Sequence, residues 1–163
     1  MAEDKCNISD LTKEIQKILI EKGQMVATAE SLTGGLVASR IVDNAGSSAV
    51  LSGGIVAYQN EVKEKMLGVP HAVLEEKGAV NEETVRAMAE GVRQRFGCEW
   101  GVATSGIAGP GGAEPGKPVG TVWMAVANSK QTEAFTKVFD GDRTQVREQT
   151  VYCVLNKLLS MLK

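Results

Sequence analysis

Apolar residues recur along this chain with helical spacing in some segments and in short continuous runs in others. Residues 8–22 carry a leucine or isoleucine every three or four positions, which predicts an amphipathic helix that ends at Gly23. Asn81 precedes two glutamates, and these residue types favour the start of a helix. Helices are predicted over residues 8–22, 33–43, 61–67 and 81–96, and for roughly twenty residues after Gly141-Asp142.

Short apolar runs bounded by turn residues predict five strands. They cover residues 25–29, 50–59, 101–105, 119–127 and 133–139. The second run is interrupted by Gly53-Gly54, and residues 106–118 are rich in glycine and proline, which predicts a loop. His71 follows Pro70 in a predicted connector, where we expect it to lie at the surface.

The order of these elements, α-β-α-β-α-α-β-β-β-α, indicates the fold class. Alternation of strands and helices favours a parallel sheet with helices on both faces, and the closing hairpin adds antiparallel pairing. We therefore expect an α/β fold with three layers, α/β/α, around a mixed, mostly parallel sheet of about five strands. No repeat, linker or low-complexity tail interrupts the pattern, so a single domain over residues 1–163 is expected.

The composition restricts the class of protein. The net charge is −2 and no Lys/Arg cluster occurs, which argues against a nucleic-acid partner. The apolar runs are shorter than the about 20 residues that span a membrane, and the N-terminus lacks the pattern of a signal peptide. Cys6, Cys98 and Cys153 are odd in number and widely spaced, which favours reduced thiols and a cytoplasmic location. Because His71 is the only histidine, a Ser-His-Asp triad or a His-rich metal site is not expected.

A strand runs into a helix around residues 28–35, and Ser31 occupies the turn between them. Ligands of open α/β sheets bind outside the carboxyl ends of strands, and free N–H groups at a helix start favour an anion or a developing oxyanion. Gly34 and Gly35 allow a ligand to approach the backbone closely. Ser31 is therefore a candidate site residue; the alternative is that Ser31 or Thr33 only caps the helix.

A second strand exit carries Tyr58, Asn60 and Lys63. A lysine acts as a general base when burial lowers its pKa. Lys63 could instead be one solvated lysine among several, since Lys65 lies close by.

Two later segments offer groups suited to phosphate or carboxylate. Residues 104–112 follow a strand and hold more glycine than a connector needs; such loops present N–H groups to anions, although a flexible surface loop has the same composition. Arg143 and Arg147 lie one turn apart at a helix start, where positive charge opposes the helix dipole. Recognition of an anion would explain both arginines, and so would ion pairs with Asp140 or Asp142.

Together these segments resemble the CinA C-terminal domain family, whose stand-alone members include the nicotinamide mononucleotide amidohydrolases. The resemblance runs from about residue 23 to residue 158, and Leu32 stands at a tolerant position where many members carry cysteine. The matching motifs are Ala29-Glu30-Ser31-x-Thr33-Gly34-Gly35, Gly46-Ser47-Ser48, Tyr58-x-Asn60-Glu61-x-Lys63, Leu67-Gly68-Val69, Gly78-Ala79-Val80, Ser105-Gly106-Ile107-Ala108-Gly109-Pro110, Lys117-Pro118-Val119-Gly120-Thr121-Val122, and Gly141-Asp142-Arg143 with Arg147.

The resemblance implies hydrolysis of nicotinamide mononucleotide to nicotinate mononucleotide and ammonia, in pyridine nucleotide salvage, with no cofactor and no metal. Ser31 would attack the carboxamide carbon and Lys63 would take its proton. A backbone N–H at the start of the helix over residues 33–43 would hold the oxyanion, and Tyr58 would orient or stack on the ring.

The other expected site residues are assigned to substrate binding. They are Glu30, Thr33, Gly34, Gly35, Asn60, Ser105, Gly106, Ala108, Gly109, Arg143 and Arg147. Ser48 precedes a predicted strand and is the alternative nucleophile. The expected partner is a small nucleotide substrate, neither nucleic acid nor membrane is expected, and a homo-oligomer stays open.

Two other functions stay open as well. One is a related amidase acting on another nucleotide-like carboxamide, and the other is a non-catalytic module that senses a nucleotide. Retention of both Ser31 and Lys63 argues against the second. Ammonia release from nicotinamide mononucleotide, nicotinamide and glutamine would discriminate among the three.

Overall fold

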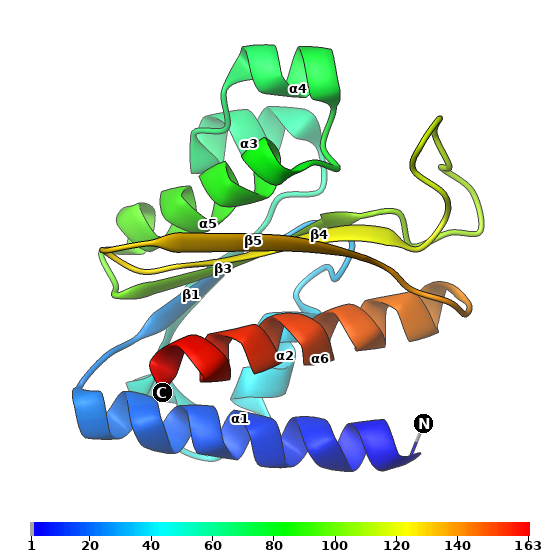
Figure 1. Ribbon diagram of the computed structural model, residues 1–163. Coiled ribbons are helices and arrows are strands. Elements are labelled where there is room, and N and C mark those ends of the chain that lie inside the picture. Colours follow the sequence, from blue (N-terminus) through cyan, green and yellow to red (C-terminus); the bar gives the residue numbers. More distant parts are fainter. Residues whose placement is uncertain (1) are drawn as a thin grey trace.

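The structure, a computed structural model, describes the backbone of residues 2–163 and the side chains from residue 8 onward. In this part of the chain, helices lie on both faces of a five-stranded sheet (Figure 1). The elements are α1 (Ala2–Lys22), β1 (Val26–Glu30), α2 (Leu36–Val42), η1 (Ser47–Ala49), β2 (Leu51–Val56), α3 (Asn60–Leu67), α4 (His71–Lys77), α5 (Glu82–Phe96), β3 (Trp100–Gly106), β4 (Thr121–Ala127), β5 (Thr132–Val138) and α6 (Arg143–Leu162).

The strand order is β2-β1-β3-β4-β5. β1 pairs in parallel with β2 and β3, whereas β4 is antiparallel to both β3 and β5. The mixed five-stranded sheet is therefore confirmed. Four of its five strands point the same way, although the four pairings divide evenly into two parallel and two antiparallel. Because β1, β2 and β3 are parallel, their carboxyl ends meet at one edge of the sheet.

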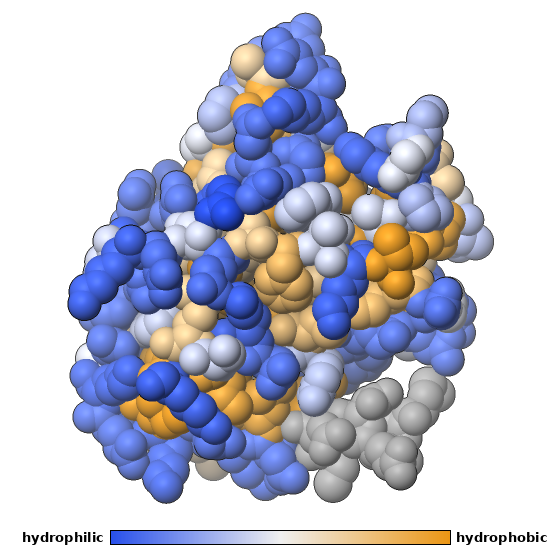
Figure 2. All heavy atoms as spheres, viewed as in Figure 1, coloured by the Kyte–Doolittle hydropathy of each residue, from blue (hydrophilic) through white to orange (hydrophobic). Residues whose placement is uncertain are grey.

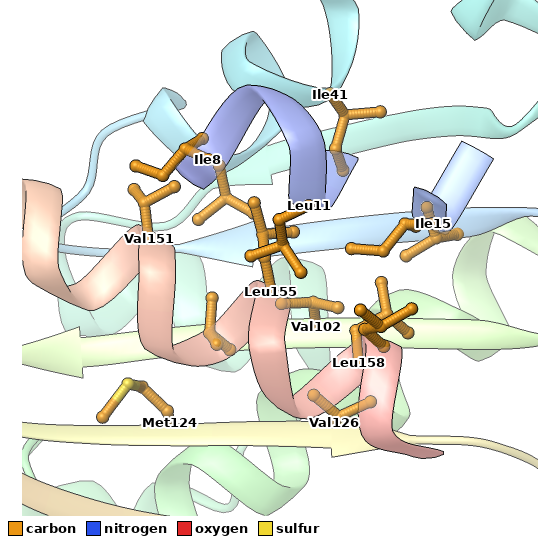
Figure 3. Close-up of a cluster of buried hydrophobic side chains, with 14 of the residues drawn as sticks. Ile8, Leu11, Ile15, Ile41, Val102, Met124, Val126, Val151, Leu155 and Leu158 are labelled. Carbon is orange, nitrogen blue, oxygen red and sulfur yellow. The ribbon is translucent and has the colours of Figure 1, made fainter. Parts of the chain in front are cut away.

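The three expected layers are visible in Figure 1, with α3, α4 and α5 on one face of the sheet and α1, α2 and α6 on the other. The larger apolar cluster lies on the second face, where side chains such as Ile15 of α1 and Leu155 of α6 pack over Val102 of β3 (Figure 3). Fully burying one such side chain contributes about 1.5–3 kcal/mol. On the first face, Ala27 and Ala29 lie in the cluster that α5 covers.

The surface follows from this layering. Figure 2 shows hydrophilic residues over the outer sides of the helical layers and apolar residues between them, around the sheet edge and α6. Within the described residues, no helix is both long enough and apolar enough to cross a bilayer. Cys98 and Cys153 are free thiols, and the side chain of Cys6 lies outside the described residues.

Two predictions about the elements need correction. The segment around His71 is a helix, α4, and not a connector, although His71 itself is exposed as expected. Seven residues are too few for a periodic apolar pattern to show in the sequence. The helix predicted over residues 33–43 begins only at Leu36, because residues 31–35 form a turn in which Gly34 and Gly35 have positive φ.

Candidate active site

A cavity of about 210 Å³ lies at the carboxyl edge of the parallel strands. Ser31 and Leu32 follow β1, Tyr58 follows β2, and the end of β3 forms another wall. This is the edge where open α/β sheets bind ligands. Seven of the predicted site residues line the cavity, namely Ser31, Tyr58, Lys63, Ser105, Gly106, Ala108 and Arg143.

The side chain of Lys63 is buried beside Ser31. Lys63 comes from the middle of α3 and is only 1% exposed. Its Nζ lies 3.2 Å from Ser31 Oγ and donates to the carbonyl oxygens of Ala57 at 2.8 Å and Tyr58 at 3.0 Å. With Cε, these three oxygens give Nζ four neighbours, as many as a tetrahedral nitrogen has positions. In a neutral amine the two carbonyls take both N–H donors, so the lone pair faces the Ser31 hydroxyl.

Burial determines the protonation of this lysine. Removal of the ammonium from water lowers the pKa of Lys63 from 10.5 to about 8. At this pKa the amine is neutral in about one tenth of the molecules at pH 7, and the neutral form can accept a proton. The protonated form can then donate that proton to a leaving group. The sequence left open whether Lys63 is a solvated lysine like its neighbour Lys65; Lys63 is buried, and Lys65 is exposed.

Backbone N–H groups beside Ser31 can stabilise negative charge. The Ser31 carbonyl accepts from Gly34 N at 3.1 Å, so it points into the turn, and the Leu32 N–H on the same planar peptide points outward. Gly106 offers a second donor. Ile107 N donates to Thr121 O of β4, and bonding direction alternates along a strand, so the Gly106 N–H faces the β1 side, where Ser31 follows the strand.

The helix start, in contrast, is already occupied. The carboxylate of Glu30 accepts from the amides of Val37 at 2.8 Å and Ala38 at 3.1 Å, which are the first-turn donors of α2. Glu30 also accepts from the Thr33 hydroxyl and is 1% exposed. The N–H groups that the sequence suggested for an oxyanion therefore bind Glu30, and Glu30 and Thr33 do not line the cavity.

The two arginines have different surroundings. Arg143 reaches the mouth of the cavity, where it donates to Gly109 O at 2.8 Å and to the Tyr58 hydroxyl at 3.2 Å. Arg147 points toward the turn of residues 31–35 and donates to the carbonyls of Leu32 at 2.9 Å and Thr33 at 3.0 Å. Among the side chains that the structure describes, neither arginine forms the ion pair with Asp140 or Asp142 that the sequence left open.

Ser48, the alternative nucleophile, is far from Lys63. Ser48 lies in η1, before β2, whereas Ser31 follows β1. Because β1 and β2 are parallel, the two serines are at opposite edges of the sheet. β2 is six residues long, which separates these edges by about 20 Å.

Other predicted site residues surround the cavity without lining it. Asn60 is exposed at the start of α3. Gly34 and Gly35 shape the turn, and Gly109 contributes its carbonyl to Arg143. Apart from the residues at its beginning, the glycine-rich loop lies away from the cavity.

Three lining residues were not predicted. Leu32, Ala79 and Val80 complete the wall. Ala79 and Val80 follow α4, and Ser105 holds this segment in place by donating from its hydroxyl to Ala79 O at 2.8 Å. Their motif, Gly78-Ala79-Val80, contributes small apolar side chains and no reactive group, so only the resemblance could have pointed to it.

Two larger hollows, of about 390 and 340 Å³, lie between α1 and the end of α2. Among the described side chains, neither hollow is lined by a hydrogen-bonded pair of nucleophile and base. Within the same residues, no group of three or more His, Cys, Asp or Glu side chains is suited to hold a metal ion. The cavity with Ser31 and Lys63 is therefore the stronger candidate for chemistry.

A serine hydrogen-bonded to a buried lysine at the carboxyl edge of the sheet defines this molecule as a three-layer α/β protein with a serine–lysine site. The family model of the CinA C-terminal domain matches residues 8–162, and the chain belongs to that family. Among curated relatives, a CinA-like protein of Anaeromyxobacter dehalogenans is 51% identical over 145 residues, and one of Geobacter sulfurreducens is 46% identical over 144.

Solved structures have the same fold. The competence/damage inducible protein CihA from Agrobacterium tumefaciens matches with a TM-score of 0.93 and 39% identity, over 96% of both chains. A competence or damage-inducible protein from Enterobacter asburiae matches with a TM-score of 0.92 and 35% identity, over 96% of this chain and 98% of that one. The matches to the curated relatives cover 89% and 88% of this chain but only 36% and 35% of the relatives' own length.

Proposed function

We propose that this protein is an amidohydrolase that converts nicotinamide mononucleotide to nicotinate mononucleotide and ammonia. The observation that carries the proposal is the 3.2 Å contact between Ser31 Oγ and Lys63 Nζ, in which two carbonyls hold the amine in the orientation of a base. Family membership supports the fold. The substrate is the one that the resemblance to the family implies, and the cavity offers groups that suit it.

The first half of the reaction forms an acyl-enzyme. Ser31 Oγ bonds to the carboxamide carbon as its proton moves to Lys63 Nζ, and the carbonyl electron pair moves onto oxygen. The Leu32 and Gly106 N–H groups are positioned to stabilise that oxyanion. As the oxyanion collapses, the carbon–nitrogen bond breaks and the proton on Lys63 passes to the amide nitrogen, which leaves as ammonia.

The second half returns the enzyme to its starting state. A water molecule attacks the ester carbon while Lys63, neutral again, accepts a proton from it. When the ester carbon–oxygen bond breaks, Lys63 returns this proton to Ser31 Oγ. The products are the carboxylic acid and the free serine, so one water and one amide give one acid and one ammonia.

The dimensions of the cavity suit one part of the substrate. Its volume of about 210 Å³ is below the roughly 300–1,000 Å³ of pockets that enclose drug-sized ligands. The pyridine ring and carboxamide fit inside, and the ribose phosphate extends to the rim. Tyr58 is 60% exposed there and offers its ring face, and Arg143 offers a cation to the phosphate.

Activity is expected to increase with pH up to the pKa of Lys63. Lys63 accepts the Ser31 proton only when it is neutral, and its pKa is about 8. The value of kcat/KM should therefore rise about tenfold per pH unit below pH 8 and level off above it. Initial rates of ammonia release between about pH 6 and pH 9.5 measure this, and a flat profile below pH 8 would contradict the role of Lys63.

The proposed function is tested by measuring ammonia released by purified protein from three amides in the presence of excess chelator. We expect turnover of nicotinamide mononucleotide, little of free nicotinamide and none of glutamine, because only the first carries a phosphate for Arg143. Turnover of another carboxamide alone would refute the substrate. Binding of nucleotide without release of ammonia would support a sensing module instead, and activity restored after chelation only by one divalent metal would refute the serine–lysine mechanism.

A further inference from the structure

Glu30 is a buried carboxylate directly before Ser31. Its Oε1 accepts from the Thr33 hydroxyl at 2.6 Å and from Val37 N at 2.8 Å, and its Oε2 accepts from Ala38 N at 3.1 Å. Glu30 does not line the cavity, so it is not placed to contact a substrate there. All three of its partners lie within eight residues downstream, on the turn that carries Ser31 or on the helix that follows.

The hydrogen bonds of Glu30 also connect the turn of residues 31–35, which carries the proposed nucleophile, to the sheet. A carboxylate only accepts, so the Thr33 hydroxyl donates to Glu30, and the Thr104 hydroxyl, 2.8 Å away, donates to Thr33. The carbonyl of Thr104 in turn accepts from Ser31 N at 3.0 Å. Glu30 thus stands at the start of a chain of hydrogen bonds that returns to the backbone of the proposed nucleophile.

Arg147 holds the same turn through the opposite set of backbone groups. It donates to the carbonyls of Leu32 and Thr33, whereas Glu30 accepts from the amides at the start of α2. The guanidinium of Arg147 therefore binds carbonyls of the turn from Ser31 to Gly35, and the carboxylate of Glu30 binds the amides that follow this turn. Both side chains approach it from outside the cavity.

We propose that Glu30 is a positioning residue that holds Ser31 within hydrogen-bond reach of Lys63 and aims the Leu32 N–H outward. This inference rests on the proposed role of Ser31 as nucleophile. A carboxylate suits the place because each of its three partners is a donor. A glutamine would turn an NH₂ group toward a backbone N–H, and the turn would have to move to separate the two donors.

The test is the variant Glu30→Gln, with the reactivity of Ser31 measured independently of any amide. A fluorophosphonate probe reacts with an activated serine when Oγ bonds to phosphorus, fluoride leaves, and the proton passes to the neighbouring base. We expect labelling of Ser31 to slow by about 10- to 100-fold, since a displacement of about 1 Å at a reacting atom costs up to this much. The kcat for the amide should fall in parallel, while KM changes by less than about threefold.

The matched control is Glu99→Gln, which changes another glutamate that accepts from a backbone amide, that of Met25, at the opposite end of β1 from Ser31. It should leave labelling and kcat unchanged. Thr33→Val and Thr33→Ser supply a second test. The valine removes the hydroxyl between Glu30 and Thr104 and should slow labelling, and the serine retains it and should restore the rate.

Three outcomes would overturn the positioning role. In the first, folded Glu30→Gln labels at the wild-type rate. In the second, it loses thermal stability but keeps its kcat below the melting temperature. In the third, Glu30→Gln does not fold and Thr33→Val labels as fast as the wild type. A wild type that labels at Ser31 but hydrolyses no nicotinamide mononucleotide refutes only the substrate, and the labelling rates still decide the role of Glu30. A wild type with neither reaction refutes both proposals.

Discussion

Lys63→Met should reduce turnover at least about 100-fold while the protein stays folded. The magnitude is that of a lost general base. Methionine keeps an unbranched chain in a site that is 1% exposed, so packing changes little, but it has no lone pair to take the Ser31 proton. The substitution also removes a group that burial penalises when it is charged, since the pKa of Lys63 is lowered to about 8. Steady-state ammonia release and circular dichroism measure the two effects.

Two further variants test whether activity requires the proton-accepting amine of Lys63 or only a positive charge at this position. Lys65→Met changes an exposed lysine on the same helix and should leave kcat and KM unchanged. Lys63→Arg retains a cation that stays protonated, so it should be as inactive as Lys63→Met. If folded Lys63→Met kept more than about a third of the wild-type turnover, Lys63 would not be the base.

The fold could be predicted from the sequence where elements are long or strongly patterned. The five strands and the helices α1, α5 and α6 each carry an apolar period or a capping signal, and each was found within a few residues, except that α1 begins at Ala2, six residues before the predicted start. α4 could not be found in this way because it has seven residues and only one that is buried, Leu74. The start of α2 was set too early because the helical pattern continues through a turn that two positive-φ glycines create.

The site was predictable where a reactive side chain follows a strand, as Ser31 and Tyr58 do, because the carboxyl ends of parallel strands meet at one edge. The direction in which a side chain points was not predictable from the sequence. Glu30 belongs to a motif that matches the family and Arg147 lies near a helix start, so both were assigned to substrate binding. Each instead binds backbone groups of the turn, a choice that depends on three-dimensional packing.

Ser48 shows that local sequence can also suggest a candidate that the structure places far from the other site residues. A glycine-serine sequence beside a strand has the composition of a catalytic turn, but Ser48 precedes its strand and so lies at the edge away from Lys63. Ala79 and Val80 form part of the cavity wall, but they carry no reactive group by which the sequence could have indicated them. Reactive groups are visible in a sequence, and the apolar surfaces that shape a cavity around them are not.

Arg143→Ala should raise KM for nicotinamide mononucleotide by roughly ten- to a hundredfold and hardly change the faint activity on free nicotinamide. A charge-assisted contact contributes about 1.5–3 kcal/mol, and 1.4 kcal/mol corresponds to a factor of ten. The ring and carboxamide are common to both compounds, so discrimination between them must come from the ribose phosphate. The chain carries a net charge of −2, so long-range attraction does not supply it and a local cation is required. Arg143 lines the cavity, and its partners among the described residues are the neutral oxygens of Gly109 and Tyr58, which a phosphate would outcompete.

Arg147→Ala is the matched comparison, because both arginines lie at the start of α6. Arg147 binds the carbonyls of Leu32 and Thr33 beside Ser31, the proposed nucleophile, so its loss should lower kcat for both amides in the same proportion and reduce thermal stability. KM and kcat are to be measured with the two amides side by side on folded variants. If Arg143→Ala also lost both activities equally, recognition of the phosphate by Arg143 would be ruled out, and its bonds to Gly109 and Tyr58 would have to be purely structural.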